Sequence, residues 1–181
     1  MRVLTLSMSF LILSFSSLIA LATTSEQNTT KDGQIIETLM VIDSNEINAA
    51  KIALKRTGNA DVKDFAQTMI TDHSKNLQST KALSQKIHIN SVVTEQSLFL
   101  QKQGEEELKK LASIPAKKFD ISFINAMVKD HKGALQIINA TSAKTRNPEL
   151  VKHLQATRDT VSHHLQMARE VRTKLEQRSA D

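Results

Sequence analysis

Glycine and proline, the two residues that most often interrupt helices, are scarce in this chain. Only four glycines and two prolines occur among 181 residues. So few turn-forming residues argue against a β-rich fold and favour long helices. The length suits about one domain, and hydrophobic residues at 40% supply a core. The absence of cysteine from the sequence excludes disulfide scaffolds, thiolate metal sites and cysteine nucleophiles.

The first 22 residues have the pattern of a signal peptide. Met1-Arg2 is a short basic start, residues 3–22 are mostly apolar, and Ala20-Leu21-Ala22 matches the small-x-small pattern of a cleavage site. Because the apolar run is about long enough to span a bilayer, an uncleaved anchor is the alternative. We predict cleavage, a flexible polar linker over residues 23–31, a periplasmic or secreted location, and no stable membrane insertion after cleavage.

Apolar residues recur at helical spacing throughout residues 32–178. Five helices are expected, with approximate bounds 32–56, 61–87, 94–112, 113–144 and 147–177; Ser113 starts the fourth, with Pro115 just inside. Short loops join the first helix to the second and the fourth to the fifth, so each pair should form an antiparallel hairpin. The third helix is long enough to carry the chain back along the bundle. The sequence therefore predicts an all-α, ferritin-like four-helix bundle with an extra helix in the long crossover between two hairpins.

An internal repeat relates the second and fourth expected helices. Residues 65–73 and 123–131 share Phe, Met, Asp and His at matching positions, with an offset of 58 residues. Chance can match a few apolar positions, but it does not readily reproduce these four residue types at one offset. The two helices are therefore expected to be equivalent parts of a bundle with two similar halves.

Four polar residues lie in the middle of apolar helix faces: Glu46, His73, His131 and His164. Since a helix advances about 100° per residue, each of the four has apolar neighbours within about 40° of its own direction. Glu46 and His73 are equally far from the first hairpin turn, and His131 and His164 are equally far from the second. If the hairpins pack face to face, one carboxylate and three imidazoles converge near the middle of the bundle.

Burial of these residues requires compensation, because an unpaired carboxylate or an unsatisfied imidazole is unfavourable in an apolar core. One stable outcome is a hydrogen-bonded network without an ion, in which Glu46 pairs with a protonated histidine. The other is a divalent transition metal ion bound by Glu46, His73, His131 and His164. Four central residues at one level favour the metal site.

The ligand types restrict the metal. Three histidines and one glutamate suit zinc, and with added water they also suit iron or manganese. Thioethers near the histidines would favour Cu(I), although methionines on a core face more often serve packing; these are Met69, Met127 and Met167. Asp72 and Asp130 each precede a candidate ligand and point elsewhere. They either bond to ligands on neighbouring helices or pair with surface lysines.

At these residues the chain resembles the exported bacterial family catalogued as domain of unknown function 4142, a ferritin-like helical family. The resemblance covers about residues 37–171. It rests on Glu46, the motif of residues 65–73, the motif of residues 126–131, and His164-Leu165. It implies a ferritin-like bundle outside the cytoplasm and no established activity.

Several activities are not expected. Di-iron bundles carry Glu-x-x-His on two helices, whereas Ile70 and Val128 stand three positions before His73 and His131. Two adjacent iron ions and ferroxidase chemistry are therefore not expected, and no catalytic residues are identified. The formal net charge of +5 is spread along the chain without interleaved aromatic residues, so nucleic-acid binding is not expected either.

Three hypotheses follow from the sequence. The first is an exported metal-binding bundle that serves metal buffering or an envelope stress response. The second is a structural or protein-interaction module of the envelope, in which the polar cluster is only a buried network. The third is a mononuclear metalloenzyme with an open coordination position.

Overall fold

The structure, a computed structural model, describes the backbone of residues 16–178 and the side chains from residue 28 onward. Within this range the chain forms five helices and no strand. Their bounds are α1 Ser16–Arg56, α2 Ala60–Lys86, α3 Glu95–Ser113, α4 Ala116–Ser142 and α5 Pro148–Arg178. The prediction of an all-helical bundle is confirmed.

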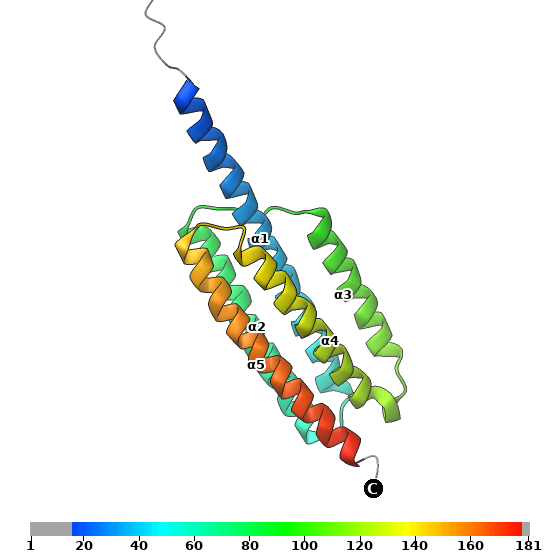
Figure 1. Ribbon diagram of the computed structural model, residues 1–181. Coiled ribbons are helices and arrows are strands. Elements are labelled where there is room, and N and C mark those ends of the chain that lie inside the picture. Colours follow the sequence, from blue (N-terminus) through cyan, green and yellow to red (C-terminus); the bar gives the residue numbers. More distant parts are fainter. Residues whose placement is uncertain (1–15, 179–181) are drawn as a thin grey trace, which may run out of the picture.

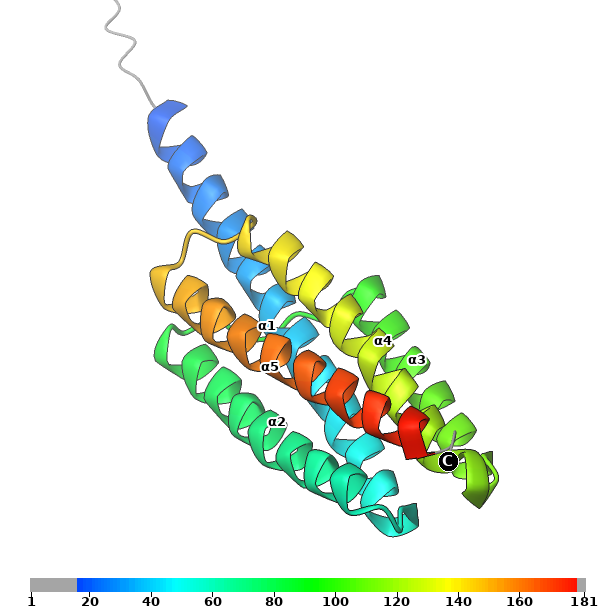
Figure 2. The same ribbon diagram turned by 60° about the horizontal axis from the view of Figure 1, so that its bottom comes forward.

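The helices form two hairpins, α1–α2 and α4–α5, joined by a crossover that contains α3 (Figure 1). Helix α5 packs against both α2 and α4, and α1 packs against α2 and α4, so these four helices surround the interior of the bundle (Figure 2). Helix α3 lies beside these four helices and packs mainly against α1, and its Leu111 is buried in the adjoining apolar cluster. The crossover thus contains a fifth helix beside the other four, and the predicted extra helix between two hairpins is present.

Helix α1 begins earlier than predicted. The segment of residues 23–31, predicted to be a flexible linker, is helical as part of α1, which projects beyond the other helices at its N-terminal end (Figure 1). Polar residues alone do not end a helix, and no proline or glycine occurs between Ser16 and Asp32. Once a helix is nucleated, each further residue adds a hydrogen bond at a smaller entropic cost.

The predicted signal peptide falls largely on residues 1–15, which lie outside the described residues. Among the residues that are described, no helix is both long and apolar enough to cross a membrane.

The start of α4 also differs from the prediction. Ser113 is the last residue of α3, and its hydroxyl donates to the carbonyl of Lys110. Ile114 is extended and Pro115 occupies the N-cap position of α4. The difference follows from steric clash between a proline ring and the preceding residue, which disfavours helical geometry at Ile114.

Side-chain contacts hold α3 against α1. The Asn45 amide donates to the Leu100 carbonyl at 2.9 Å, and the Arg56 guanidinium donates to the carbonyls of Leu111 and Ile114. Gly104 makes the close approach of the two helices feasible, because a Cβ at this position would lie 2.3 Å from the Asn45 side chain. Helix α3 is therefore a fixed wall beside the bundle.

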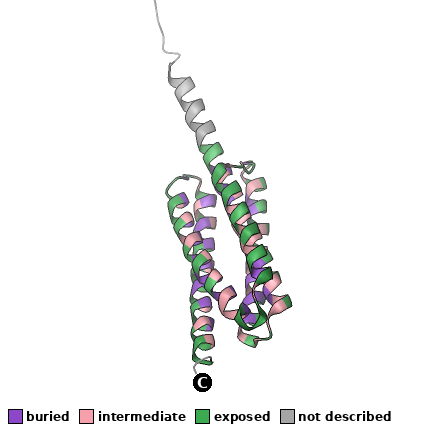
Figure 3. Ribbon diagram, turned by 90° about the vertical axis from the view of Figure 1, so that its right-hand side faces the viewer, coloured by how far each residue is buried: buried purple, intermediate pink, exposed green. Residues whose placement is uncertain are grey.

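The interior consists of two apolar clusters at opposite ends of the bundle. Buried residues lie on the inward faces of the helices (Figure 3). One cluster, near the α1–α2 turn, contains Phe65, Phe119 and Phe123. The other contains Leu150 and Leu154. Each fully buried side chain of this size stabilises the fold by roughly 1.5–3 kcal/mol. Between the two clusters lies a layer of buried polar side chains, and this layer is the candidate site.

Candidate metal centre

Three histidines from three different helices meet in the polar layer. His73 on α2, His131 on α4 and His164 on α5 are only 3%, 1% and 0% exposed. Their ring centroids lie between 5.1 and 5.8 Å apart. One potential ligand atom from each lies within 4.8 Å of the other two. The predicted convergence of these three residues is therefore present in the structure.

Each ring is held by a hydrogen bond on its outer side. His73 Nδ1 bonds to Asp43 Oδ1 at 2.8 Å, and His164 Nε2 bonds to Asp72 Oδ2 at 2.9 Å. His131 Nδ1 bonds to the carbonyl of Met127, one turn earlier on α4, at 2.8 Å. Because carboxylate and carbonyl oxygens accept hydrogen bonds, the histidine nitrogen donates in each case. These contacts fix the ring orientation and the tautomer, as outer partners do for metal-binding histidines.

The second nitrogen of each ring has no hydrogen-bond partner among the described residues: His73 Nε2, His131 Nε2 and His164 Nδ1. In a neutral ring whose other nitrogen carries the proton, this nitrogen bears a lone pair. Three buried lone pairs without donors are unfavourable, since each unsatisfied group costs about 1–3 kcal/mol. A metal ion bound by all three would satisfy them together.

Burial favours the neutral form of two of these rings, His131 and His164. Burial, together with the neighbouring His73 and His164, lowers the pKa of His131 to about 3. Burial also lowers the pKa of His164, although its hydrogen bond to Asp72 opposes the shift. Both imidazoles are therefore unprotonated near neutral pH, which is the form that binds metal ions.

Glu46, the fourth predicted ligand, lies beside the histidines but outside their group. Its side chain is 6% exposed, and Oε1 lies 3.8 Å from Nδ1 of His131. That nitrogen already bonds to Met127, and the distance is too long for a hydrogen bond. Glu46 Oε2 has no hydrogen-bond partner among the described residues. The structure brings together three of the four predicted residues and places Glu46 next to one of them.

The surroundings of Glu46 do not favour an ionic network with histidine. Burial raises its pKa well above the usual value, and the neighbouring carboxylates of Asp130, Asp43 and Glu107 raise it further. The pKa of His131 moves in the opposite direction, so both shifts disfavour the charged forms that an ion pair requires. The predicted alternative, a protonated histidine paired with Glu46, is therefore not favoured by these shifts.

Asp43 is a functional candidate that the sequence interpretation missed. It is 2% exposed and accepts hydrogen bonds from His73 and from the amide of Asn76, at 2.9 and 3.2 Å to its two oxygens. Asn76 in turn accepts from the Thr157 hydroxyl at 3.0 Å. Burial raises the pKa of Asp43, whereas its bonds to His73 and Asn76 lower it. The chain of contacts connects α1, α2 and α5 behind His73.

A sequence signal for Asp43 does exist. It lies four residues after Leu39, on the buried face of α1, and it is as far from the α1–α2 turn as Asn76 is. The same two criteria that identified Glu46 and His73 therefore also apply to Asp43.

The two aspartates that precede His73 and His131 have different roles. Asp72 bonds to His164 across α2 and α5, which confirms the first of the two predicted alternatives for this residue. Asp130, its counterpart in the repeat, lies on α4 near Glu46 of α1. Burial and the Glu107 charge raise the pKa of Asp130 to about 6. The repeat thus places one aspartate in a hydrogen bond with His164 and the other near Glu46.

Two groups of residues near the site have structural roles. Met69 and Met127 are buried in the apolar cluster that adjoins the histidines, and Met167 packs against it. His153 lies one layer away, with Nε2 2.8 Å from the Thr80 hydroxyl. Among residues with described side chains, no second group of three potential ligands reaches the spacing of the histidine group.

Three buried ring nitrogens at this spacing suit a single ion. Tetrahedral zinc commonly has three protein ligands and one water molecule, and iron or manganese accept histidines together with additional oxygen ligands. The group lacks the paired carboxylates that hold two adjacent iron ions. The arrangement can therefore hold one divalent transition metal ion.

Comparison with known proteins places the chain in a family without assigning an activity. No curated protein and no solved structure matches it. A family model described as a domain of unknown function, DUF4142, matches residues 19–171, which include all five helices in whole or in large part. The chain therefore belongs to the DUF4142 family of domains of unknown function.

Proposed function

We propose that this protein is an exported metal-binding protein that holds one divalent transition metal ion in a ferritin-like helical bundle. The proposed ligands are His73 Nε2, His131 Nε2 and His164 Nδ1. The observation that carries the proposal is that these three buried nitrogens lack partners in a group whose ligand atoms are within 4.8 Å of one another. Glu46 is left out of the ligand set because its carboxylate is not part of that group.

The outer hydrogen bonds support metal binding over a purely structural role. A buried imidazole that only fills space needs a partner for each nitrogen. Here one nitrogen of each ring is hydrogen-bonded and the other has no partner among the described residues. A bound ion converts three unsatisfied acceptors into ligands, and its binding free energy adds to the stability of the fold.

Zinc or iron is the proposed metal, and copper is the alternative. Three imidazoles and one water molecule match zinc without further protein ligands. Iron needs more oxygen ligands, which water can supply. Buffering of a metal in the periplasm, or protection of the envelope under metal stress, is the role proposed for such a site, and residues 1–22 support export through their signal-peptide pattern.

Metal analysis tests the site directly. The protein is purified from an export-competent bacterial host without chelators, and its zinc, iron and copper contents are measured before and after incubation with each ion. We expect close to one ion per chain in the wild type and loss of that ion in His73→Ala, His131→Ala and His164→Ala. His163→Ala is the matched control, because His163 is exposed and adjacent to His164 on α5. Absence of metal from the wild type under every supply refutes the proposal.

Cell fractionation tests the proposed location. We expect the protein in the periplasmic or secreted fraction, with a new N-terminus directly after Ala22. A protein that retains Met1 in the cytoplasmic fraction contradicts export, and this outcome is independent of the metal analysis.

A further inference from the structure

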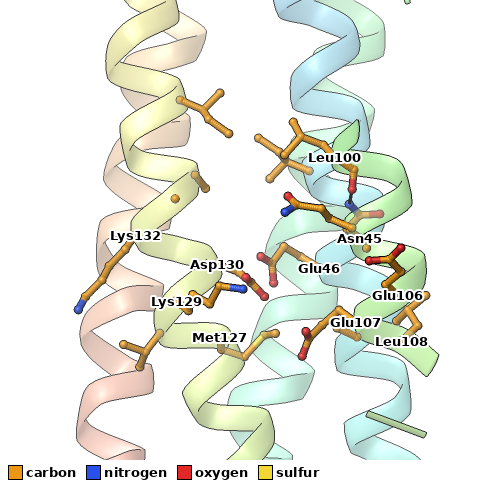
Figure 4. Close-up of a pocket in the computed structure, with 18 of the residues that line it drawn as sticks. Asn45, Glu46, Leu100, Glu106, Glu107, Leu108, Met127, Lys129, Asp130 and Lys132 are labelled. Carbon is orange, nitrogen blue, oxygen red and sulfur yellow. Dashed lines mark hydrogen bonds between the residues drawn. The ribbon is translucent and has the colours of Figure 1, made fainter. Parts of the chain in front are cut away.

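A pocket of about 740 Å³ lies between α1, α3 and α4. Its inner wall includes Glu46 and Met127, and α3 forms its outer wall through Leu100, Gly104 and Glu107 (Figure 4). The bond between Asn45 and the Leu100 carbonyl holds this wall in place. The pocket is therefore a fixed feature of the fold, with one side against the polar layer.

Four acidic side chains from three helices line the pocket: Glu46 of α1, Glu106 and Glu107 of α3, and Asp130 of α4. Figure 4 shows the Glu46 and Asp130 side chains pointing toward one another, with Glu107 nearby. Glu46 is only 6% exposed, and its Oε2 has no hydrogen-bond partner in the described part of the chain. A buried carboxyl oxygen that accepts no hydrogen bond is unfavourable, and a cation bound in the pocket would compensate it.

The inner end of this pocket borders the histidine group. Glu46 Oε1 is 3.8 Å from the His131 ring, and Asp130 directly precedes His131 on α4. The three histidines are at most 3% exposed, so an ion must pass between side chains to reach them. The pocket brings solvent to within one side chain of His131.

We propose that Glu46, Glu107 and Asp130 form a loading site that binds a divalent transition metal cation before it passes to the three histidines. The inference rests on the metal-binding function proposed above and adds the route of uptake. Lys110, Lys129 and Lys132 also line the pocket and offset part of the negative charge, so binding at the loading site is weak. Weak binding suits a transfer step, because the cation must leave these oxygens for the nitrogen ligands.

A second route competes with this one. Asp72, which bonds to His164, has a side chain that is 37% exposed, so the far side of the histidine group is also near the surface. If the ion enters through the pocket, replacement of Glu46 slows its uptake. If it enters from the opposite side, replacement of Asp72 does so.

Stopped-flow absorbance with Co²⁺ alone separates the routes, since Co²⁺ bound by three nitrogens absorbs visible light. The full-length exported protein is compared with Glu46→Gln, Glu107→Gln and Asp72→Asn, and helicity is checked for each by circular dichroism. Glu105→Gln is the matched control, because Glu105 is an exposed acid on α3 outside the pocket lining. Gly133→Leu narrows the pocket without changing its charge. Gly133 lines the pocket, and a Cβ at this position would meet nothing within 4 Å.

We expect Glu46→Gln to slow both association and dissociation of Co²⁺ by about tenfold, in line with the effect of local charge on association rates. The dissociation constant then stays within about twofold of the wild type, because a residue on the route changes the two rates equally. Glu107→Gln and Gly133→Leu are expected to slow both rates in the same direction, and Glu105→Gln to leave them unchanged.

Three results overturn the loading site. Wild-type association rates in both Glu46→Gln and Gly133→Leu show that the ion enters elsewhere, and slower association in Asp72→Asn alone identifies the opposite route. Weaker Co²⁺ binding in Glu46→Gln with unchanged association makes Glu46 a ligand instead of a transfer residue. Failure of the wild type to bind Co²⁺, together with absence of metal in the analysis above, overturns the proposed function itself.

Discussion

Replacement of Asp43 by alanine should weaken both the fold and the metal site. The carboxylate accepts from His73 Nδ1 at 2.8 Å and from Asn76 Nδ2 at 2.9 Å, so its loss leaves two donors without an acceptor in a layer where Asp43 is 2% exposed. Each buried unsatisfied donor costs about 1–3 kcal/mol. The variant no longer buries the Asp43 carboxylate, whose burial is itself unfavourable and raises its pKa, and this gain offsets part of the cost. We expect a net loss of about 3 kcal/mol in the free energy of unfolding.

The same change should affect metal affinity through His73. Without Asp43 nothing fixes the proton on Nδ1, so the ring can turn or take the tautomer that places a hydrogen on Nε2. Loss of such an outer partner typically lowers metal affinity about 10- to 100-fold. Asp43→Asn should have a smaller effect on both quantities, because its amide oxygen still accepts from one donor.

Two measurements test this reasoning. Urea unfolding of the metal-free protein, followed by circular dichroism, gives the stability change, and Co²⁺ titration gives the affinity change. Asp64→Ala is the control, since Asp64 is an exposed acid on α2. Asp72→Ala should lower Co²⁺ affinity with a smaller loss of stability, because the Asp72 side chain is 37% exposed. Wild-type urea midpoints and Co²⁺ affinity in Asp43→Ala would refute the argument.

Three further predictions concern the bound ion, the buried glutamate and the wall of the pocket. Zn²⁺ at about a thousand times its dissociation constant should add about 4 kcal/mol to stability and raise the melting temperature by about 10 °C in calorimetry, an effect that is absent in His164→Ala. Folding raises the pKa of Glu46, so the folded chain keeps a proton that the unfolded chain releases, and wild-type stability falls as pH rises above about 4.5. The advantage of Glu46→Gln in urea unfolding of the metal-free protein should therefore grow by about 1.4 kcal/mol per pH unit from there up to the raised pKa; an advantage that is constant with pH would contradict this. Gly104→Ala should destabilise the protein by about 1–2 kcal/mol, because its Cβ would meet Asn45 at 2.3 Å, whereas Gly133→Ala should stabilise it by up to about 1 kcal/mol; equal urea midpoints for the two variants would contradict this assignment.

The meeting point of the three histidines could be predicted from the sequence because a helix fixes the height and direction of each of its residues. The position of a residue along a helix sets its height, and its phase relative to the apolar stripe sets the direction of its Cβ. Hairpins with short loops then place residues that are equally distant from the turn at one level. His73, His131 and His164 satisfy both conditions, and the structure brings their ring nitrogens together.

The start of α1 shows where such reasoning stops working. No turn residue interrupts residues 16–31, so the polar composition of 23–31 was the sole reason to expect a linker. Composition reports how well a segment is solvated, whereas the end of a helix requires a residue that breaks or caps the hydrogen-bond pattern. The α1–α2 and α4–α5 turns have such residues, and both were predicted closely.

Glu46 shows a different limit, which concerns the side chain instead of the backbone. Its level and burial agree with the prediction, since it is 6% exposed and 3.8 Å from His131. A glutamate has three rotatable bonds, however, and its carboxylate can reach either edge of a neighbouring ring. The edge that it faces here carries Nδ1, which already bonds to the Met127 carbonyl. The backbone carbonyl therefore takes the contact that a sequence argument assigns to the carboxylate, and Glu46 is left facing Asp130 and the pocket. A contact between a side chain and the backbone of its own helix leaves no trace in the spacing of polar residues, so the level of Glu46 was predictable and its partner was not.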